Sequence, residues 1–284
     1  MLCHSRVLRV DLPLLTIVIL TSNEEKRISR CLKSLSDRKI KVVIIDSFSK
    51  DQTRLKAFKT WEDSGQSLEN LAFIEREWKG FTEARNFSLS WVNTPWVLWL
   101  DADEWIEVDL KESLDKLNAL DSNFDVFKIS RQSYFLGKAI RFGGWYPDRK
   151  ARLGRVGHCE WRRGPRGADV HEDLYSLKDT ERPSLRGHIG HEPFLDLQEQ
   201  YDTNWRYSTL LAEALAVDYR VGKKRPKTKI EMWIKVLIKF FENYILKMGI
   251  LDGKPGYIIA RGSALSLWWR FNKAKQLYME TPKS

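Results

Sequence analysis

Short apolar runs alternate with stretches of helical periodicity through the first 120 residues of the chain. The runs have the continuity of strands buried on both faces, and they occupy Leu14–Leu20, Val42–Ile45, Leu71–Ile74 and Trp96–Leu100. Between them, apolar positions recur at helical spacing, as in a segment from about Gly80 to Trp91. This alternation predicts an α/β fold with a doubly wound, mostly parallel sheet flanked by helices.

Polar residues that can cap helices stand where two of these helices would begin. Ser22 and Glu25 have the spacing of a capping box, and an apolar helical stripe follows them. Ser49 and Gln52 have the same spacing before the next helical stretch. We therefore expect both pairs to lie at helix N-termini.

Three of the predicted strands are followed at once by side chains that can bind ligands. Asn23 comes after the first run, Asp46 ends the second, and Asp101 and Asp103 follow the fourth. In doubly wound sheets, ligands bind beyond the carboxyl ends of the strands. We therefore expect these side chains to converge at one edge of the sheet.

The carboxylates after the fourth strand indicate a cation site. Asp101, Asp103 and Glu104 stand close together, and unpaired carboxylates are costly to bury. Asp101 and Asp103 can hold a hard divalent ion whose shell diphosphate oxygens would complete, although a solvated acidic helix N-terminus is the alternative. The phosphate-binding patterns GxGxxG and GxxxxGK[ST] are absent, so a nucleotide here would depend on carboxylates and a metal.

The pattern changes after a helix expected near Asp109–Leu120. Asp125–Ser130 alternates as a strand, and the segments Tyr134–Lys138 and Arg141–Arg149 are rich in glycine, aromatic residues and arginine. This composition suits loops that shape a carbohydrate pocket, where rings stack on sugar faces. Ordinary hairpin turns with packed aromatic side chains are the alternative.

A second acidic cluster, Asp169–Leu174, lies farther along the chain. A catalytic base must lie near the acceptor rather than near the metal, and this cluster supplies a separate candidate. His171 stands within it without metal-ligand spacing and is interpreted as structural or as a residue that supports the metal ligands. His188 and His191 follow a plausible short strand, and either could complete a metal shell or serve as a structural histidine.

The chain turns helical and basic from about Pro193, which predicts a catalytic domain over residues 1–192 and a helical extension over 193–284. Residues 221–284 hold 14 Lys/Arg and 4 Asp/Glu, so this tail carries the whole net charge of +10. Ile230–Leu251 would form a helix with apolar residues around most of its circumference, and it follows the basic segment Lys223–Lys229. This arrangement is typical of an interfacial membrane anchor, although a helix packed on the catalytic domain or in a dimer is the alternative.

The sequence disfavours a disulfide-rich secreted protein, a transmembrane protein and a nucleic-acid-binding protein. Three widely spaced cysteines form no disulfide framework, which favours a reducing compartment. Asp11 and Pro13 interrupt the first apolar run, and no charge-free stretch reaches 18 residues, so we expect neither a signal peptide nor a transmembrane helix. The basic tail interleaves its charges with apolar residues, which suits lipid better than a nucleic-acid backbone.

Several segments resemble, in order and spacing, the family 2 glycosyltransferases with a GT-A (Rossmann-like) fold: Thr21–Glu25, Asp46–Thr53, Gly80–Asn86 and Asp101–Glu104. Others resemble the bacterial lipopolysaccharide-core subgroup, whose members add a β-1,4-linked glucose to an inner-core heptose: Tyr134–Gly137, Gly143–Arg149, Val170–Glu172 and Leu251–Gly256. The likeness covers nearly all of residues 14–275, and the sequence GGWYPDR is a specific signal within it.

The resemblance implies a role for each matching position on the donor side. A nucleotide-sugar donor would be bound by Thr21, Asn23, Glu24, Asp46, Ser47, Arg85, Asn86 and Asp101. Mg or Mn would be bound by Asp101 and Asp103, and His191, a candidate from its position in the sequence alone, is the further possible ligand. The donor would be a UDP-hexose, and the metal would bind its diphosphate.

The resemblance also implies roles for residues on the acceptor side. Glu172 would be the base that deprotonates the acceptor hydroxyl, and Asp173 is the second choice. The acceptor or sugar pocket would be formed by Trp145, Asp148 and Arg149. Arg149 and Arg152 could neutralise phosphates of donor or acceptor. Inversion fits this design, because one displacement needs one base and one electrophilic metal.

The chain departs from the family pattern at two places. The usual glycine of the second motif is Phe48 here, so that turn must take a bulkier residue. The insert Arg162–Gly167 is unusually basic and would meet phosphorylated core sugar or form a solvated loop.

The sequence therefore predicts an inverting, metal-dependent hexosyltransferase that is peripheral on the cytoplasmic face of the bacterial inner membrane. It would transfer glucose from UDP-glucose to a lipopolysaccharide-core or lipid-linked glycan acceptor. The alternative is a non-catalytic, membrane-associated protein that binds a sugar nucleotide or polysaccharide on a GT-A scaffold. Nucleic acid is not an expected partner.

Overall fold

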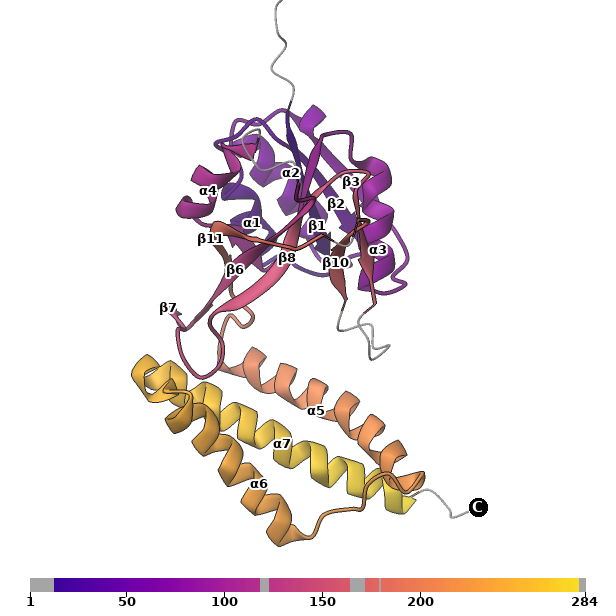
Figure 1. Ribbon diagram of the computed structural model, residues 1–284, viewed down its shortest axis with the longest axis vertical. Coiled ribbons are helices and arrows are strands. Elements are labelled where there is room, and N and C mark those ends of the chain that lie inside the picture. Colours follow the sequence, from indigo (N-terminus) through magenta and orange to yellow (C-terminus); the bar gives the residue numbers. More distant parts are fainter. Residues whose placement is uncertain (1–12, 118–122, 164–171, 179, 281–284) are drawn as a thin grey trace, which may run out of the picture. The chain divides into compact units, whose positions relative to one another are not determined.

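The computed structural model describes residues 13–117, 123–163, 172–178 and 180–280. The predicted strands form one half of its main sheet, in the order β3-β2-β1-β4 with every pairing parallel. Their bounds are β1 (Leu15–Thr21), β2 (Lys41–Asp46), β3 (Leu71–Glu75) and β4 (Trp96–Asp101). Each strand lies within a residue or two of its predicted run, so the parallel α/β core is confirmed (Figure 1).

The sheet continues from β4 in the order β8-β6-β11-β5, and β8 runs antiparallel to β4. These strands are β5 (Glu104–Ile106), β6 (Val126–Phe135), β8 (Asp148–Arg155) and β11 (Ser184–His191). A short strand, β7 (Lys138–Ala139), pairs with β6. A separate antiparallel ribbon is formed by β9 (Cys159–Arg162) and β10 (Asp173–Ser176).

The continuous apolar runs bury both faces of the sheet, because successive side chains of a strand point to opposite sides. Ile17 and Ile19 pack into a cluster covered by α1 (Ile28–Lys33), α2 (Thr53–Asp63) and α4 (Val108–Leu114). Val18 and Leu20 pack into a second cluster with α3 (Phe81–Ser88) and the β9–β10 ribbon. Two short 3₁₀ turns, Leu68–Asn70 and Leu89–Trp91, flank these elements.

Both predicted helix caps are wrong. The helix α1 begins at Ile28 after the N-cap residue Arg27, whose side chain does not cap it, and α2 begins after Gln52, again without a side-chain cap. Glu25 instead accepts a bond from the Gln52 amide, and Ser49 bonds to Asp46 and Asn23. Glu25, Ser49 and Gln52 are thus used to join the two loops to each other. The helix predicted near Asp109–Leu120 ends at Leu114, and its last predicted residues lie outside the described chain.

The chain divides into two compact units, residues 1–131 with 149–190, and residues 132–148 with 191–284. In the second unit, α7 (Lys254–Glu280) contacts both α5 (Leu197–Arg220) and α6 (Lys229–Phe241). Segment 138–142 joins this unit through Asp252, whose carboxylate accepts bonds from the Arg141 and Phe142 amides at 3.1 and 2.9 Å. The predicted boundary after residue 192 remains a prediction.

The long helix predicted over Ile230–Leu251 is wrong in its second half. A π-helical turn, Glu242–Leu246, follows α6, and a 3₁₀ turn, Gly249–Asp252, comes next. Met248 has a left-handed φ of 57°, which ends the helix, and a Cβ on Gly249 would lie 2.6 Å from the Asn243 carbonyl oxygen. No helix in the described ranges is long and apolar enough to cross a membrane.

Candidate active site

The polar residues predicted to converge do meet at the carboxyl edge of the parallel strands. The register pairs Thr21 with Asp46 across β1 and β2, and Leu20 with Asp101 across β1 and β4. The Ser47 amide continues this edge by donating to the Thr21 carbonyl at 3.0 Å. Residues that are far apart in sequence thus form one continuous rim.

Reciprocal hydrogen bonds join the loops after β1 and β2. The Asn23 amide donates to Ser49 Oγ at 2.8 Å, and the Asn23 side-chain oxygen accepts from the Lys50 amide at 2.8 Å. Buried Asp46 accepts from the Ser49 amide and hydroxyl at 2.8 and 2.5 Å. The amide of Glu24 donates to Thr53 Oγ1 at 2.8 Å. This half of the rim is held in place by its own polar groups.

Two residues in these loops have left-handed backbones, Asn23 with a φ of 57° and Phe48 with a φ of 52°. Asparagine tolerates this region, whereas phenylalanine is strained there. The conformation explains the glycine expected at position 48. The side chain of Phe48 is exposed to solvent.

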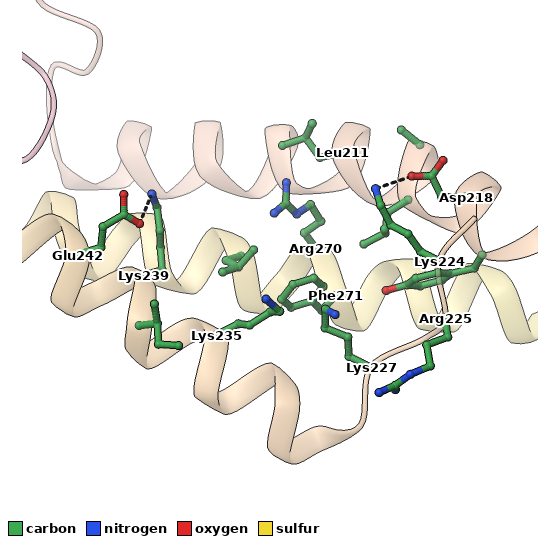
Figure 2. Close-up of a pocket in the computed structure, with 15 residues that line it drawn as sticks. Leu211, Asp218, Lys224, Arg225, Lys227, Lys235, Lys239, Glu242, Arg270 and Phe271 are labelled. Atoms are coloured by element: carbon green, nitrogen blue, oxygen red, sulfur yellow. Dashed lines mark hydrogen bonds and ion pairs between the residues drawn. The ribbon is translucent and has the colours of Figure 1, made fainter. Parts of the chain in front are cut away.

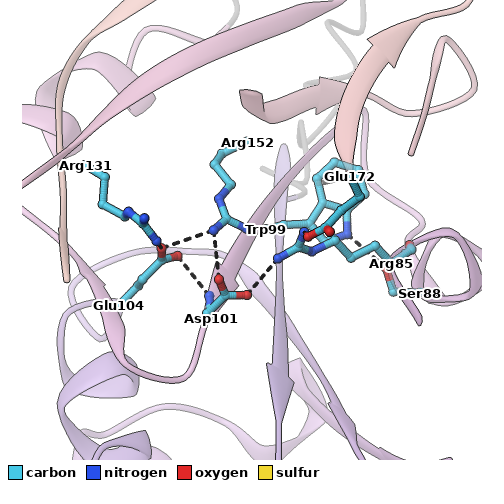
Figure 3. Close-up of polar contacts among 8 residues, drawn as sticks. All are labelled: Arg85, Ser88, Trp99, Asp101, Glu104, Arg131, Arg152 and Glu172. Carbon is cyan, nitrogen blue, oxygen red and sulfur yellow. Dashed lines mark hydrogen bonds and ion pairs between the residues drawn. The ribbon is translucent and has the colours of Figure 1, made fainter. Parts of the chain in front are cut away.

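Asp101, the last residue of β4, is held between two arginines (Figure 3). Its Oδ1 accepts from Arg85 Nη2 at 2.9 Å and its Oδ2 from Arg152 Nη2 at 2.8 Å. Burial alone would raise the pKa of this carboxyl, but the charges of Arg152 and Arg85 outweigh burial and hold the pKa well below its usual range. Asp101 is therefore ionised at neutral pH.

Glu104 supports this arrangement through its buried carboxylate (Figure 3). Its side chain is fully buried, and it accepts from the Asp101 amide at 3.0 Å. Arg152 Nη2 and Arg131 Nη1 lie 3.1 and 3.3 Å from its Oε1. Burial would lower the pKa of Arg152, yet the nearby Asp101 and Glu104 carboxylates raise it. Glu104 thus orients Asp101 and Arg152.

Arg85 connects this cluster to the second acidic segment. Its Nη1 lies 2.5 Å from Glu172 Oε1, while its Nη2 bonds Asp101. The two side chains of this link are deeply buried, with 3% of Arg85 and 11% of Glu172 exposed. The Arg85 guanidinium also stacks 4.3 Å from the Trp161 ring centroid. One guanidinium therefore joins the two acids to which the sequence assigns different roles.

Several buried polar atoms at this cluster have no hydrogen-bond partner within the described chain: Glu172 Oε2, Arg85 Nε, Arg152 Nη1 and Thr21 Oγ1. Buried polar groups are normally bonded, so unpaired atoms gathered at one site favour ligand binding there. In particular, Glu172 has one oxygen fixed by Arg85 and one oxygen available.

The other candidate residues differ in how fully the protein uses them. Asp173 accepts from Arg182 Nη1 at 2.6 Å and from the Leu174 amide at 3.0 Å, so both of its oxygens are engaged. The Asn86 side chain is bonded on both sides to the Trp161 backbone, at 2.8 and 2.9 Å. Asn86 thus fixes α3 to β9, and its predicted place beside the donor stays a prediction.

The candidate histidines and the pocket residues make contacts of their own. His188 Nδ1 lies 2.5 Å from Asp109, and His191 Nδ1 lies 3.2 Å from Ser133 Oγ in the second compact unit. Trp145 packs against Phe194, with ring centroids 6.3 Å apart. Asp148 is half-buried and Arg149 is exposed, and His171 and most of the basic insert, residues 164–167, lie outside the described residues. The predicted roles of His191, Trp145, Asp148 and Arg149 stay predictions.

The residues at the rim suit a hard divalent cation. Asp103 supplies a carboxylate here, and Asp101 is kept ionised by the two arginines that bond its oxygens in this structure. Across the described residues, no group of three or more His, Cys, Asp or Glu side chains forms a closed metal site. A cation at this rim would have to take its remaining ligands from a diphosphate and water.

Sequence reasoning missed Arg131 and the connecting role of Arg85. Arg131 lies in β6, 27 residues from its partner Glu104, and Arg85 is 87 residues from Glu172. No local pattern marks such pairs. The partial signal was the presence of arginine in otherwise alternating or apolar segments.

Comparison with known proteins gives a consistent picture. Glycosyl transferase family 2 matches residues 16–164. The lipopolysaccharide core biosynthesis glycosyltransferase LpsC of Rhizobium meliloti (strain 1021) is 28% identical over 261 residues, which cover 90% of this chain and 92% of LpsC. The glycosyltransferase SunS of Bacillus subtilis (strain 168) is 29% identical over 108 residues, 38% of this chain and 24% of SunS.

Two solved structures are similar over most of the chain. TarS 1–349 of S. aureus has a TM-score of 0.42 and 17% identity, covering 93% of this chain and 90% of TarS. The mannosyltransferase PcManGT from Pyrobaculum calidifontis, solved with GDP-Man and Mn2+, has a TM-score of 0.45 and 15% identity. That match covers 94% of this chain and 74% of PcManGT.

Proposed function

The chain belongs to glycosyl transferase family 2 and is a glycosyltransferase, and on this premise we propose an inverting transfer of glucose from UDP-glucose to a lipopolysaccharide-core heptose or related lipid-linked glycan. The observation that carries the proposal is the Asp101–Arg85–Glu172 link. In this link one guanidinium joins Asp101, our proposed donor-side acid, to Glu172, our proposed base.

The rim after β1, β2 and β4 would bind the donor. Base and ribose would lie along Thr21, Asn23, Glu24, Asp46 and Ser47, where hydrogen bonds between the two loops fix the backbone. Mg or Mn, held by Asp103 and the ionised Asp101, would neutralise the charge that develops on the departing diphosphate. Arg85 and Arg152 keep Asp101 ionised and oriented for that task.

Glu172 would remove the proton from the acceptor hydroxyl. Its Oε1 is fixed by Arg85, and its unpaired Oε2 is available to accept that proton. The hydroxyl oxygen would attack the anomeric carbon as the bond from that carbon to UDP breaks. A single displacement of this kind inverts the α-linked donor to a β-linked product. Asp173 is the weaker candidate, because Arg182 and a backbone amide occupy its oxygens.

The acceptor would be a glycan carried on lipid at the cytoplasmic face of the bacterial membrane. Trp145, Asp148 and Arg149 would contact its sugars or phosphates, as the GGWYPDR resemblance implies. Support for the acceptor class comes from LpsC, which acts in lipopolysaccharide core biosynthesis by its name. Support for peripheral attachment comes from the many exposed apolar side chains of α6 among basic residues.

The test is transfer of glucose from labelled UDP-glucose onto core-truncated lipopolysaccharide that ends in heptose, with Mn2+ or Mg2+. We expect metal-dependent incorporation and a β linkage by NMR. An α-linked product would contradict inversion. Binding of UDP-glucose without transfer to any core acceptor would favour the non-catalytic alternative, and transfer of another hexose alone would overturn the proposed donor.

A further inference from the structure

The helical part of the second compact unit contains a groove of about 710 Å³ between α5, α6, α7 and the basic segment that precedes α6 (Figure 2). It lies wholly within residues 211–271. None of the residues assigned to the transfer reaction lines it. The groove therefore needs an explanation of its own.

The floor of the groove is apolar. Phe271 and Tyr219 are nearly buried there, with 6% and 4% exposed, and Leu215 and Leu267 continue the surface. Figure 2 shows Lys227, Lys235 and Arg270 gathered around Phe271. The groove thus combines an apolar floor with a cationic wall.

The charges of the groove are unbalanced. Six Lys or Arg side chains line it against two acids, Asp218 and Glu242. Both acids are already engaged: Asp218 lies 2.7 Å from Lys224, and Glu242 lies 3.3 Å from Lys239 and 2.5 Å from Lys247. The cation Arg225 pairs with Glu231.

Three cations remain without a carboxylate partner in the described part of the chain: Lys227, Lys235 and Arg270. Arg270 is half-buried, its Nε has no hydrogen-bond partner there, and burial lowers its pKa. A cation that is partly buried without a counter-charge is costly, and a bound anion removes that cost.

The groove adjoins an exposed apolar helix face. On α6, Ile230, Trp233, Ile234, Leu237 and Phe241 point to solvent. Ile238 belongs to that exposed face and also lines the groove. An apolar helix face beside unpaired cations is suited to the boundary between acyl chains and phosphate head groups.

We infer that this groove is a discrete binding site for one anionic, phosphate-bearing lipid. The phosphate would lie among Lys227, Lys235 and Arg270, an acyl chain would follow the floor at Phe271, and the exposed face of α6 would enter the bilayer. A nucleic acid or an acidic peptide would leave the apolar floor uncovered. The inference rests on the peripheral membrane attachment proposed above, and it does not depend on the transfer reaction.

Calorimetry with a short-chain lipid below its micelle concentration, in the absence of donor and acceptor, tests the site. We expect dioctanoyl phosphatidylglycerol to bind with one-to-one stoichiometry. Dioctanoyl phosphatidylcholine and glycerol 3-phosphate should bind at least ten-fold more weakly, since one lacks net charge and the other lacks acyl chains. Equal binding of glycerol 3-phosphate would show a simple phosphate site and overturn the lipid assignment.

Two double variants with the same loss of charge complete the test. Lys235→Gln with Arg270→Gln alters the groove, whereas Lys254→Gln with Arg261→Gln removes two exposed charges elsewhere on α7. The groove variant should lose at least ten-fold in affinity for phosphatidylglycerol, and the control should stay within about two-fold. An equal loss in both, or none in the groove variant with an unchanged circular dichroism spectrum, would overturn the inference. Lipid binding without any sugar transfer would instead contradict the proposed function alone.

Discussion

The two compact units differ in whether their charged side chains are paired. At the rim of the sheet, Asp101, Glu104 and Glu172 are each matched by an arginine, and Glu104 and Glu172 are largely withdrawn from solvent. In the helical groove, Lys227, Lys235 and Arg270 line an apolar floor without a carboxylate partner in the described chain. Paired buried charges fix geometry, as a reaction site requires, whereas unpaired charges on an apolar surface favour an anionic ligand.

Within the rim, Asp103 should give the largest effect, because in our proposal it holds the cation together with Asp101. We expect Asp103→Ala to abolish detectable glucose transfer and metal-dependent binding of UDP-glucose. Calorimetry with and without Mn2+ measures the binding, and incorporation of labelled glucose measures transfer. Retained metal-dependent activity would show that the cation is held elsewhere.

Arg85 should carry the largest share of stability among the paired charges. Arg85→Met leaves Glu172 buried without its partner and Asp101 with one arginine, so we expect the free energy of unfolding to fall by about 3 kcal/mol. Urea unfolding measures it. The control is Arg54→Gln, which breaks an exposed pair with Glu75 and should cost less than about 1 kcal/mol. Equal costs would contradict the difference between buried and surface pairs.

Acid should destabilise the rim in a defined direction. Because the folded pKa of Asp101 is held below its unfolded value of about 3.9, its ionised form stabilises the protein above that pH. This contribution should be lost as the pH falls from about 4 toward the lower folded pKa. Stability measured against pH should therefore decline less steeply below pH 4 in Asp101→Asn than in the wild type. An unchanged slope would mean that Asp101 is not ion-paired in solution.

The smallest expected effect concerns the turn beside Asp46. Phe48 has a left-handed backbone, so Phe48→Gly should relieve about 1–2 kcal/mol of strain. The greater freedom of glycine in the unfolded chain offsets part of it, which leaves a net gain of about 0.5–1 kcal/mol. Thermal unfolding should show a raised Tm for Phe48→Gly and no gain for Phe48→Ala, which keeps the Cβ. A gain with alanine would assign the effect to the exposed ring rather than to the backbone.

The sequence predicted the parts of the fold that depend on local pattern. The runs ending at Leu20, Ile45 and Leu100 became strands because continuous apolar stretches must be covered on both faces, and the acids after them met because parallel strands end together. The helix caps failed because Glu25 and Ser49 bond across loops instead of along their own helices. Residue spacing in the sequence does not show which of several possible hydrogen-bond partners a polar side chain takes in the folded protein.

The arginine pairings could not be predicted for a similar reason. Arg152 is 51 residues from Asp101, and Arg85 is 87 residues from Glu172, so only the folded chain brings each pair together. The end of α6 was misjudged because the apolar pattern continues past Phe241, while the left-handed Met248 and the close approach of Gly249 to Asn243 end the helix. Hydrophobic periodicity shows which face of a helix is apolar, but it carries no information about backbone contacts of this kind.

The division of labour between a donor-side cluster and Glu172 as the base can be tested with one pair of variants. Glu172→Gln should bind UDP-glucose with Mn2+ as the wild type does, while glucose transfer to core-truncated lipopolysaccharide falls by about 10²–10⁴-fold. Asp173→Asn should retain most of the transfer rate, since Arg182 and a backbone amide already occupy the Asp173 oxygens. The reverse result, with transfer intact in Glu172→Gln and lost in Asp173→Asn, would contradict Glu172 as the base.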